Sequence, residues 1–104
     1  MNRNTYDDFF VNFANKNKLE IILALKESDL NVSAIVKKLD CEQSAISHNL
    51  KKLANCNIVT VRQQGRERIY SLNKDTVLPM LRIVEMHVKK NCGKDCKKGC
   101  NICQ

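Results

Sequence analysis

Residues 58–72, IVTVRQQGRERIYSL, interrupt the helical pattern that the rest of the chain follows. β-Branched residues alternate here with polar ones, and Gln64-Gly65 between the two halves marks a tight turn. The segment therefore predicts a β-hairpin. Helical patterns lie on both sides of it, so the expected order of elements is αααα-β-β-α, a mainly α fold with one small hairpin.

Four helical patterns precede the hairpin and one follows it. In the first, Tyr6, Phe9, Phe10 and Phe13 recur at i, i+3, i+4 and i+7, as on one face of an amphipathic helix. An aromatic-rich terminal helix favours docking onto another surface, with ordinary core packing as the alternative. The third helix is expected to begin after Asn31, a favourable N-cap. The apolar positions of the second, third and last patterns are Leu19, Ile22, Leu23 and Leu25; Val32, Ile35, Val36 and Leu39; and Val77, Leu81, Val84 and Val88.

The fourth helical pattern, EQSAISHNLKKLANC, lies directly before the hairpin. At about 100° per residue, Ile46, Leu50 and Leu53 fall on one stripe, which we expect to be buried. The opposite arc has no carboxylate, which suits a phosphate-lined groove because a solvated helix face usually mixes both signs. Amide, hydroxyl and imidazole groups can reach base edges, whereas lysines suit phosphates. The residues of this arc are Gln43, Ser44, Ser47, His48, Lys51 and Lys52.

The hairpin adds Arg62, Arg66 and Arg68 around Gly65, with Glu67 as its acidic residue. Arginine at such a tip can enter a minor groove or clamp the DNA backbone, although such charges can also be merely solubilising. The net charge of +7 likewise favours a polyanionic partner. Two short helices joined by a tight turn and followed by a hairpin describe a winged helix-turn-helix. We therefore expect the chain to bind double-stranded DNA.

The stretch QSAISHNLKKLANCNIVTVRQQGRERIYSLN resembles the recognition helix and wing of the ArsR/SmtB family of metal-responsive repressors. The resemblance extends less strictly over about residues 6–90. It implies a homodimer joined by its first and last helices, in which each protomer presents its fourth helix to one half of an inverted-repeat operator. It also implies repression that is relieved by a small inducer, usually a metal ion. The matching residues are Ser44, Ser47, His48, Leu50 and Leu53 in the helix and Val59, Arg62, Gly65, Arg66, Tyr70 and Leu72 in the hairpin.

The chain departs from the family at its two usual sensing sites. Many members carry a Cys-Val-Cys motif at the start of the third helix, where this chain has Asn31 and Ser33. Another family site uses positions near both ends of the last helix, and of its ligands only His87 remains. We expect His87 to be a polar residue on a dimer-facing helix rather than a ligand. The other positions of that site hold Lys74, Thr76 and Lys90.

Four of the six cysteines gather near the end of the sequence, at Cys92, Cys96, Cys100 and Cys103. This spacing lets the four sulfurs converge on one centre, and the glycines at positions 93 and 99 permit tight turns. Four thiolates suit tetrahedral Zn(II) or Cd(II), and three suit As(III). Because the usual sensing sites are missing, we expect this tail to be the sensor.

Other uses of these cysteines stay open. The spacing Cys96-x3-Cys100-x2-Cys103 also fits a 4Fe–4S cluster, with Cys92 as the fourth ligand. Dithiol redox switching and a tail with incidental cysteines are further alternatives. The remaining two cysteines, Cys41 and Cys56, flank the recognition helix. They are expected to be core or turn residues, unless one of them binds the ligand together with the tail cysteines.

The expected organisation is a winged helix-turn-helix DNA-binding and dimerisation domain over residues 1–90 and a ligand-binding tail over 91–104. The sequence has no apolar run long enough to span a membrane and no visible export signal, which predicts a cytoplasmic protein with reduced thiols. It also lacks a nucleophile–base–acid set and a phosphate-binding glycine loop, so we expect no enzyme. An architectural or partition DNA-binding protein with a structural zinc tail is the alternative function.

Overall fold

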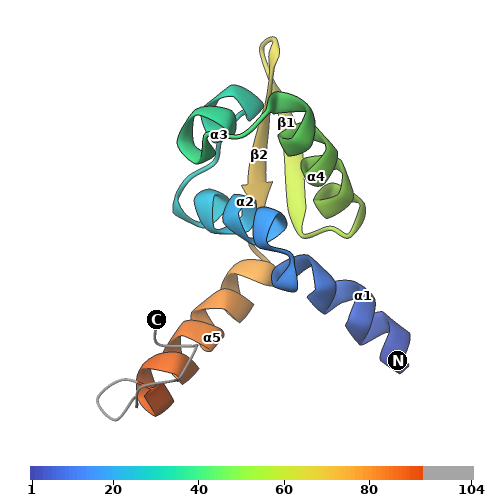
Figure 1. Cartoon of the computed structure of the whole chain (residues 1–104), viewed down its shortest axis with the longest axis vertical. Coiled ribbons are helices and arrows are strands. Elements are labelled where there is room, and N and C mark those ends of the chain that lie inside the picture. Colours follow the sequence, from blue (N-terminus) through green and yellow to red (C-terminus); the bar gives the residue numbers. More distant parts are fainter. Residues whose placement is uncertain (93–104) are drawn as a thin grey trace. The chain divides into compact units, whose positions relative to one another are not determined.

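The computed structural model describes residues 1–92 and forms two compact units, Met1–Asn73 and a second that begins at Lys74 (Figure 1). Its order of elements confirms the expected αααα-β-β-α arrangement of a winged helix-turn-helix. The first unit contains α1 (Arg3–Ala14), α2 (Lys16–Glu27), α3 (Val32–Leu39), α4 (Gln43–Asn55), β1 (Val59–Gln64) and β2 (Glu67–Leu72), and the second contains α5 (Val77–Cys92).

Asparagine side chains begin the first three helices. The Oδ1 atoms of Asn2, Asn15 and Asn31 accept hydrogen bonds from backbone amides three residues further on, at 3.1, 3.0 and 2.8 Å. Each bond satisfies a first-turn amide that has no partner within its own helix. The predicted cap at Asn31 is confirmed. Asn15 also ends α1, because its backbone N–H donates to the Val11 carbonyl at 3.1 Å.

The core of the first unit lies where α2, α3, α4 and the hairpin meet. The predicted stripe of α4 is confirmed, since Ile46, Leu50 and Leu53 are all buried. The second helix is also confirmed, but its buried face differs from the residues that first suggested it. Leu23 is 46% exposed, whereas Ile21 is fully buried. Apolar residues stand next to one another in α2, so packing against its neighbours decides which of them turn inward.

The turn between α3 and α4 depends on a left-handed residue. Asp40 has φ 53° and ψ 50°, and its N–H donates to the Val36 carbonyl at 2.8 Å. Aspartate tolerates this conformation better than most side chains do, although glycine adopts it at lower cost. The chain then leads through Cys41 into α4, which gives the tight connection of a helix-turn-helix.

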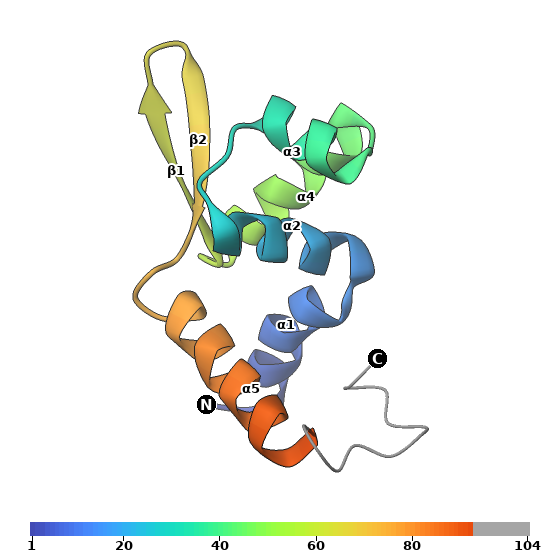
Figure 2. The same ribbon diagram turned by 90° about the vertical axis from the view of Figure 1, so that its left-hand side faces the viewer.

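The predicted hairpin is confirmed, but its two-residue turn consists of Gly65, at φ 64°, and Arg66, one residue later than Gln64-Gly65, because Gln64 pairs with Glu67. Glycine suits the first central position of such a turn because it has no steric penalty at positive φ. The loop between α2 and α3 runs beside β2 (Figure 2). There Leu30 and Tyr70 exchange two backbone hydrogen bonds of 3.0 and 2.8 Å. The loop therefore adds a one-residue bridge to the sheet.

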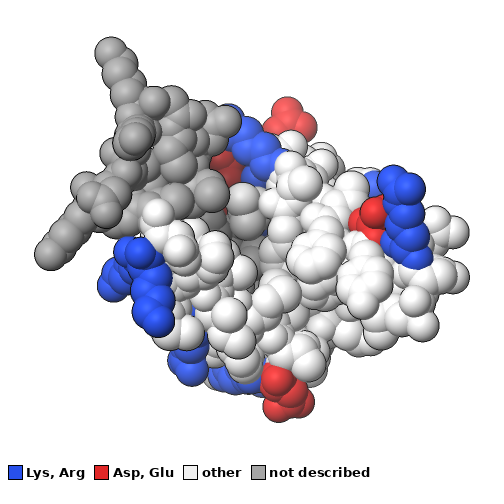
Figure 3. Space-filling model, turned by 90° about the horizontal axis from the view of Figure 1, so that it is seen from below, with Lys and Arg blue, Asp and Glu red and all other residues white. Residues whose placement is uncertain are grey.

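Helices α1 and α5 each expose apolar side chains. In α1, Tyr6 and Phe10 are both 53% exposed, and in α5, Ile83, Val84 and Met86 are exposed. Seen from below, most of the described surface carries uncharged side chains (Figure 3). Over residues 1–92, no helix is both long and apolar enough to cross a bilayer.

Candidate nucleic-acid interface

Helix α4 presents a polar face to solvent, opposite its buried stripe. All six residues predicted for this face are exposed: Gln43, Ser44, Ser47, His48, Lys51 and Lys52. The helix itself contains no aspartate or glutamate, so the face is neutral to positive along its length. Within residues 1–92, none of these six side chains forms a hydrogen bond or an ion pair. Their donors are therefore available to a ligand.

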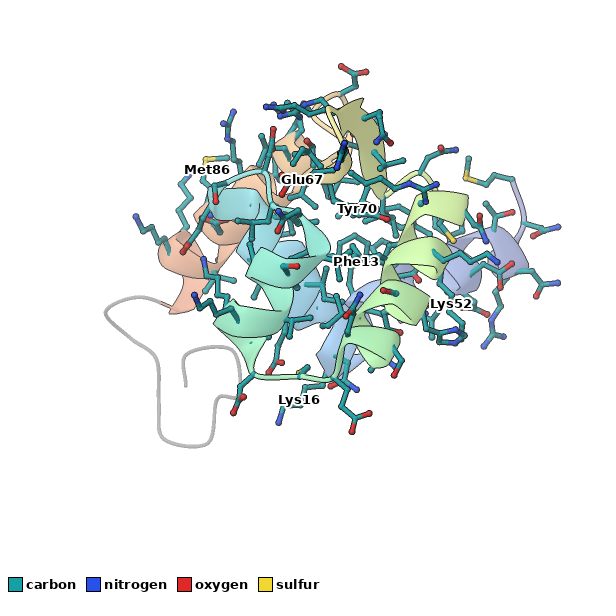
Figure 4. The ribbon with its side chains drawn as sticks, turned by 90° about the horizontal axis from the view of Figure 1, so that it is seen from above. Phe13, Lys16, Lys52, Glu67, Tyr70 and Met86 are labelled. Carbon is teal, nitrogen blue, oxygen red and sulfur yellow. The ribbon has the colours of Figure 1, made fainter. Side chains whose placement is uncertain are left out.

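A groove of about 620 Å³ lies between the first turn of α3, the polar face of α4 and the hairpin. Ser33, Ser47, Lys51 and Arg68 contribute hydroxyl and cationic groups to its lining, and Glu67 contributes a carboxylate. Figure 4 shows Glu67 and Tyr70 on the hairpin and Lys52 on the outer side of α4. Three segments distant in sequence thus present polar groups around one concave surface.

The three arginines of the hairpin differ in their contacts. Arg66 and Arg68 are exposed, and neither side chain has a partner in the part of the chain that the structure describes. Arg62 is engaged within the protein. Its Nη1 atom lies 3.0 Å from Asp29 Oδ2 and 3.1 Å from Ser71 Oγ. Its sequence position did not reveal these partners, because Asp29 is 33 residues away.

A second ion pair joins α2 and α3 away from the polar face of α4. Lys38 Nζ lies 3.0 Å from Glu27 Oε2, and both side chains are largely exposed. The hydrogen bond from Lys38, followed by the attraction of its positive charge, lowers the pKa of Glu27 below its usual value. Lys38 therefore has a partner inside the protein, whereas Lys51 and Lys52 have none among residues 1–92.

Most of the sulfur site predicted for the tail lies beyond the residues that the structure describes. Cys96, Cys100 and Cys103 lie outside the described residues, and Cys92 is described only as the last residue of α5. Among residues 1–92, no three potential metal ligands gather at one place. Asn31, at a cysteine position of the family motif, is occupied as a helix cap.

Three further candidate ligands lie within the described residues. The His87 ring faces the Asn91 amide, with 3.3 Å between His87 Nδ1 and Asn91 Nδ2. Cys41 is half-buried in the turn before α4, and its Sγ atom lies 3.4 Å from the Leu39 carbonyl oxygen. Cys56 is exposed in the turn after α4. Both cysteines thus lie in turns, as expected.

Comparison with known proteins gives concordant matches. Residues 15–61 match the family described as bacterial regulatory proteins, arsR family. A transcriptional repressor SmtB homolog of Synechocystis sp. is 30% identical over 84 residues, which cover 81% of this chain and 64% of the relative. The chain spans 57–64% of the length of three curated relatives that it matches.

Solved structures agree with this match. HlyU from Vibrio cholerae superposes with a TM-score of 0.70 at 26% identity, covering 88% of this chain and 99% of that one. The homodimeric winged helix-turn-helix domain of Mb0332 from Mycobacterium bovis superposes with a TM-score of 0.78 at 19% identity, covering 91% and 88%. These matches are regulators rather than enzymes, in agreement with the expectation from sequence. Residues 15–61 therefore form an arsR-family domain, and the chain around them resembles the ArsR/SmtB regulators in sequence and in its winged helix-turn-helix architecture.

Proposed function

We propose that the chain is a transcriptional repressor that inserts α4 into the major groove of double-stranded DNA. The observation that carries this proposal is the exposed face of α4, which has no carboxylate and whose side chains have no partners within residues 1–92. A helix with such a face fits the major groove, where donors and acceptors meet base edges. The Synechocystis relative is named as a repressor, which supports the direction of regulation.

The polar groups of the interface have different roles in this proposal. Gln43, Ser44, Ser47 and His48 read base edges, because amide, hydroxyl and imidazole groups can both donate and accept there. Lysines are point charges and suit phosphates, so Lys51 and Lys52 contact the backbone. Arg66 and Arg68 bring the hairpin tip to the backbone or into the minor groove.

The proposed assembly is a homodimer on an inverted-repeat operator, in which each protomer binds one half-site. Two helices support it by exposing large apolar side chains: Tyr6, Phe10 and Val11 on α1 and Ile83, Val84 and Met86 on α5. Covering these side chains with a second copy removes apolar surface from water and so stabilises the dimer. The match to Mb0332 supports only the shared fold.

For regulation, the proposed sensor is a thiophilic metal or metalloid held by Cys92, Cys96, Cys100 and Cys103. Support comes from the spacing of the four cysteines, which begin at the last residue of α5, and from the match to the arsR family. The organisation is then a DNA-binding and dimerisation domain over residues 1–90 and a ligand-binding tail over 91–104. If metal and DNA favour different conformations of the dimer, each lowers the affinity for the other by the same factor.

The DNA-binding part is tested by fluorescence anisotropy with a duplex from the promoter of the protein's own gene. We expect binding that weakens as salt rises, because phosphate contacts release counterions. Lys51→Glu should weaken binding by roughly tenfold or more, since it removes a phosphate contact and adds repulsion. Lys16→Glu is the matched control, because it makes the same charge change at an exposed position outside the interface. Equal losses in both variants would show that only net charge matters.

The sensing part is tested by replacing all four tail cysteines with serine. We expect DNA affinity to remain and the response to Zn(II), Cd(II) or As(III) to disappear. Absorbance near roughly 400 nm in anaerobically purified wild type would indicate the alternative 4Fe–4S cluster. Unfolding on chelation would instead support the architectural alternative with structural zinc.

A further inference from the structure

Arg62 joins the hairpin to the loop between α2 and α3. Its Nη1 atom lies 3.0 Å from Asp29 Oδ2 in that loop and 3.1 Å from Ser71 Oγ on β2. Arg62 pairs with Ile69 across the sheet, so Ser71 is its diagonal neighbour on the same face. One guanidinium nitrogen therefore holds both strands of the hairpin and the loop together.

The surroundings of this contact are partly shielded from water. Ser71 is 5% exposed, and the Asp29 side chain is 27% exposed. Ion pairs in such surroundings are less screened than pairs in free solution. The Arg62 side chain remains 53% exposed, so exposure alone does not distinguish an internal role from contact with DNA.

The next residue of the loop reinforces the same attachment. Leu30 follows Asp29 and exchanges two backbone hydrogen bonds with Tyr70 on β2. Asn31 comes next and caps α3. Asp29 thus contacts the hairpin through its side chain, and Leu30 contacts it through its backbone. The residue after them, Asn31, begins α3. Since α3 packs on α4, the loop connects the angle of the hairpin to the position of α4.

We propose that Arg62 is a positioning residue that sets the angle between the hairpin and α4 through Asp29, and that it does not itself contact DNA phosphate. This inference rests on the proposed function, because the angle matters only if both elements meet DNA. Arg66 and Arg68, which have no partners within residues 1–92, then touch the backbone. Arg62 holds the hairpin where they can reach it while α4 lies in the groove.

A double-mutant cycle distinguishes positioning from direct contact. The variants are Arg62→Ala, Asp29→Ala and the double variant, measured by anisotropy on the promoter duplex over a range of salt concentrations. We expect each single variant to weaken binding by roughly three- to tenfold and the double variant to be no weaker than either. Weaker binding by Asp29→Ala is diagnostic, because removing an acidic residue by itself improves attraction to DNA.

The salt dependence gives a second, independent readout. The slope of log K against log salt is negative, and a lost phosphate contact reduces its magnitude by about 0.9. We expect this change in the matched control Arg66→Ala and an unchanged slope in Arg62→Ala. The charge swap, Arg62→Asp with Asp29→Arg, should recover part of the lost affinity.

The outcomes separate the two proposals. If wild type itself shows no salt-sensitive binding, the proposed function fails. If wild type binds but Asp29→Ala binds more tightly, the single effects add, and Arg62→Ala loses slope, then Arg62 contacts phosphate directly and the inference is overturned. Circular dichroism confirms that each variant is folded. If Arg62→Ala unfolds, Arg62→Lys and Asp29→Asn replace the alanine variants in the same cycle.

Discussion

Helices α4 and α1 both expose a long face to solvent, yet they bury opposite kinds of residue. In α4 the buried residues are Ile46, Leu50 and Leu53, and the exposed face is polar. In α1 the buried residue is Asn12, whose amide donates to the Asp8 and Phe9 carbonyls, while Tyr6 and Phe10 are both 53% exposed. An isolated helix does not gain from exposing aromatic rings. The two faces therefore differ in chemistry, which fits the different partners proposed for them: duplex DNA for α4 and a second copy of the chain for α1.

The largest expected effect tests which helix stabilises the folded unit. Leu50→Ala should lower the free energy of unfolding by about 2–5 kcal/mol, because it leaves a cavity in the core. Phe10→Ala at a low protein concentration should cost much less, since that ring is already half exposed. Urea denaturation measures both. Similar losses in the two variants would contradict the contrast between the faces.

A second test addresses what covers α1. Phe10→Ser should raise the dissociation constant of the homodimer by roughly tenfold or more, because burying a phenylalanine side chain is worth about 1.5–3 kcal/mol. Sedimentation equilibrium measures this constant. Lys51→Ala serves as the control on α4 and should leave the association unchanged. An unchanged association in Phe10→Ser would show that the aromatic face of α1 lies outside the dimer interface.

A third prediction concerns the junctions that precede α2 and α4. Asp40 is in the left-handed region, so Asp40→Gly should stabilise the fold by about 0.5–1 kcal/mol. Asn15 at the other junction is extended, with φ −80° and ψ 120°. Asn15→Gly should therefore destabilise the fold by a few tenths of a kcal/mol through loss of the cap. If both substitutions moved the melting temperature in the same direction, backbone strain at Asp40 but not at Asn15 would be contradicted.

The smallest expected effect comes from the exposed pair between α2 and α3. The folded pKa of Glu27 is lowered by Lys38, so the pair stabilises the protein above the unfolded pKa of about 4.3 and loses that effect as pH falls through the folded pKa. Melting temperatures of wild type and Lys38→Met should differ slightly at pH 7 and converge near pH 3. A difference that persists at pH 3, or that salt does not reduce, would indicate another cause.

Much of the fold was predictable because local patterns of apolar, capping and turn residues determine its helices and hairpin. The stripe of α4, the cap at Asn31 and the turn at Gly65 each depend on residues a few positions apart. The sequence did not reveal the burial of Asn12 or the exposure of Leu23, since packing decides which side of a helix turns inward. The partners of Arg62 were also missed, because Asp29 meets it only after the chain has folded. The six polar residues of α4 were predicted to be exposed, whereas their contact with DNA and the sulfur site of the tail stay predictions.

Asn15 ends one helix with its backbone and begins the next with its side chain. The same residue therefore caps both helices at the break between α1 and α2. We expect Asn15→Ala, which removes the cap and favours helix, to fuse α1 and α2 into one rod. Such a fusion would redirect the aromatic face without altering any residue of α4. In the proposed dimer, this one substitution would change the geometry of subunit pairing and leave the polar face of α4 as it is.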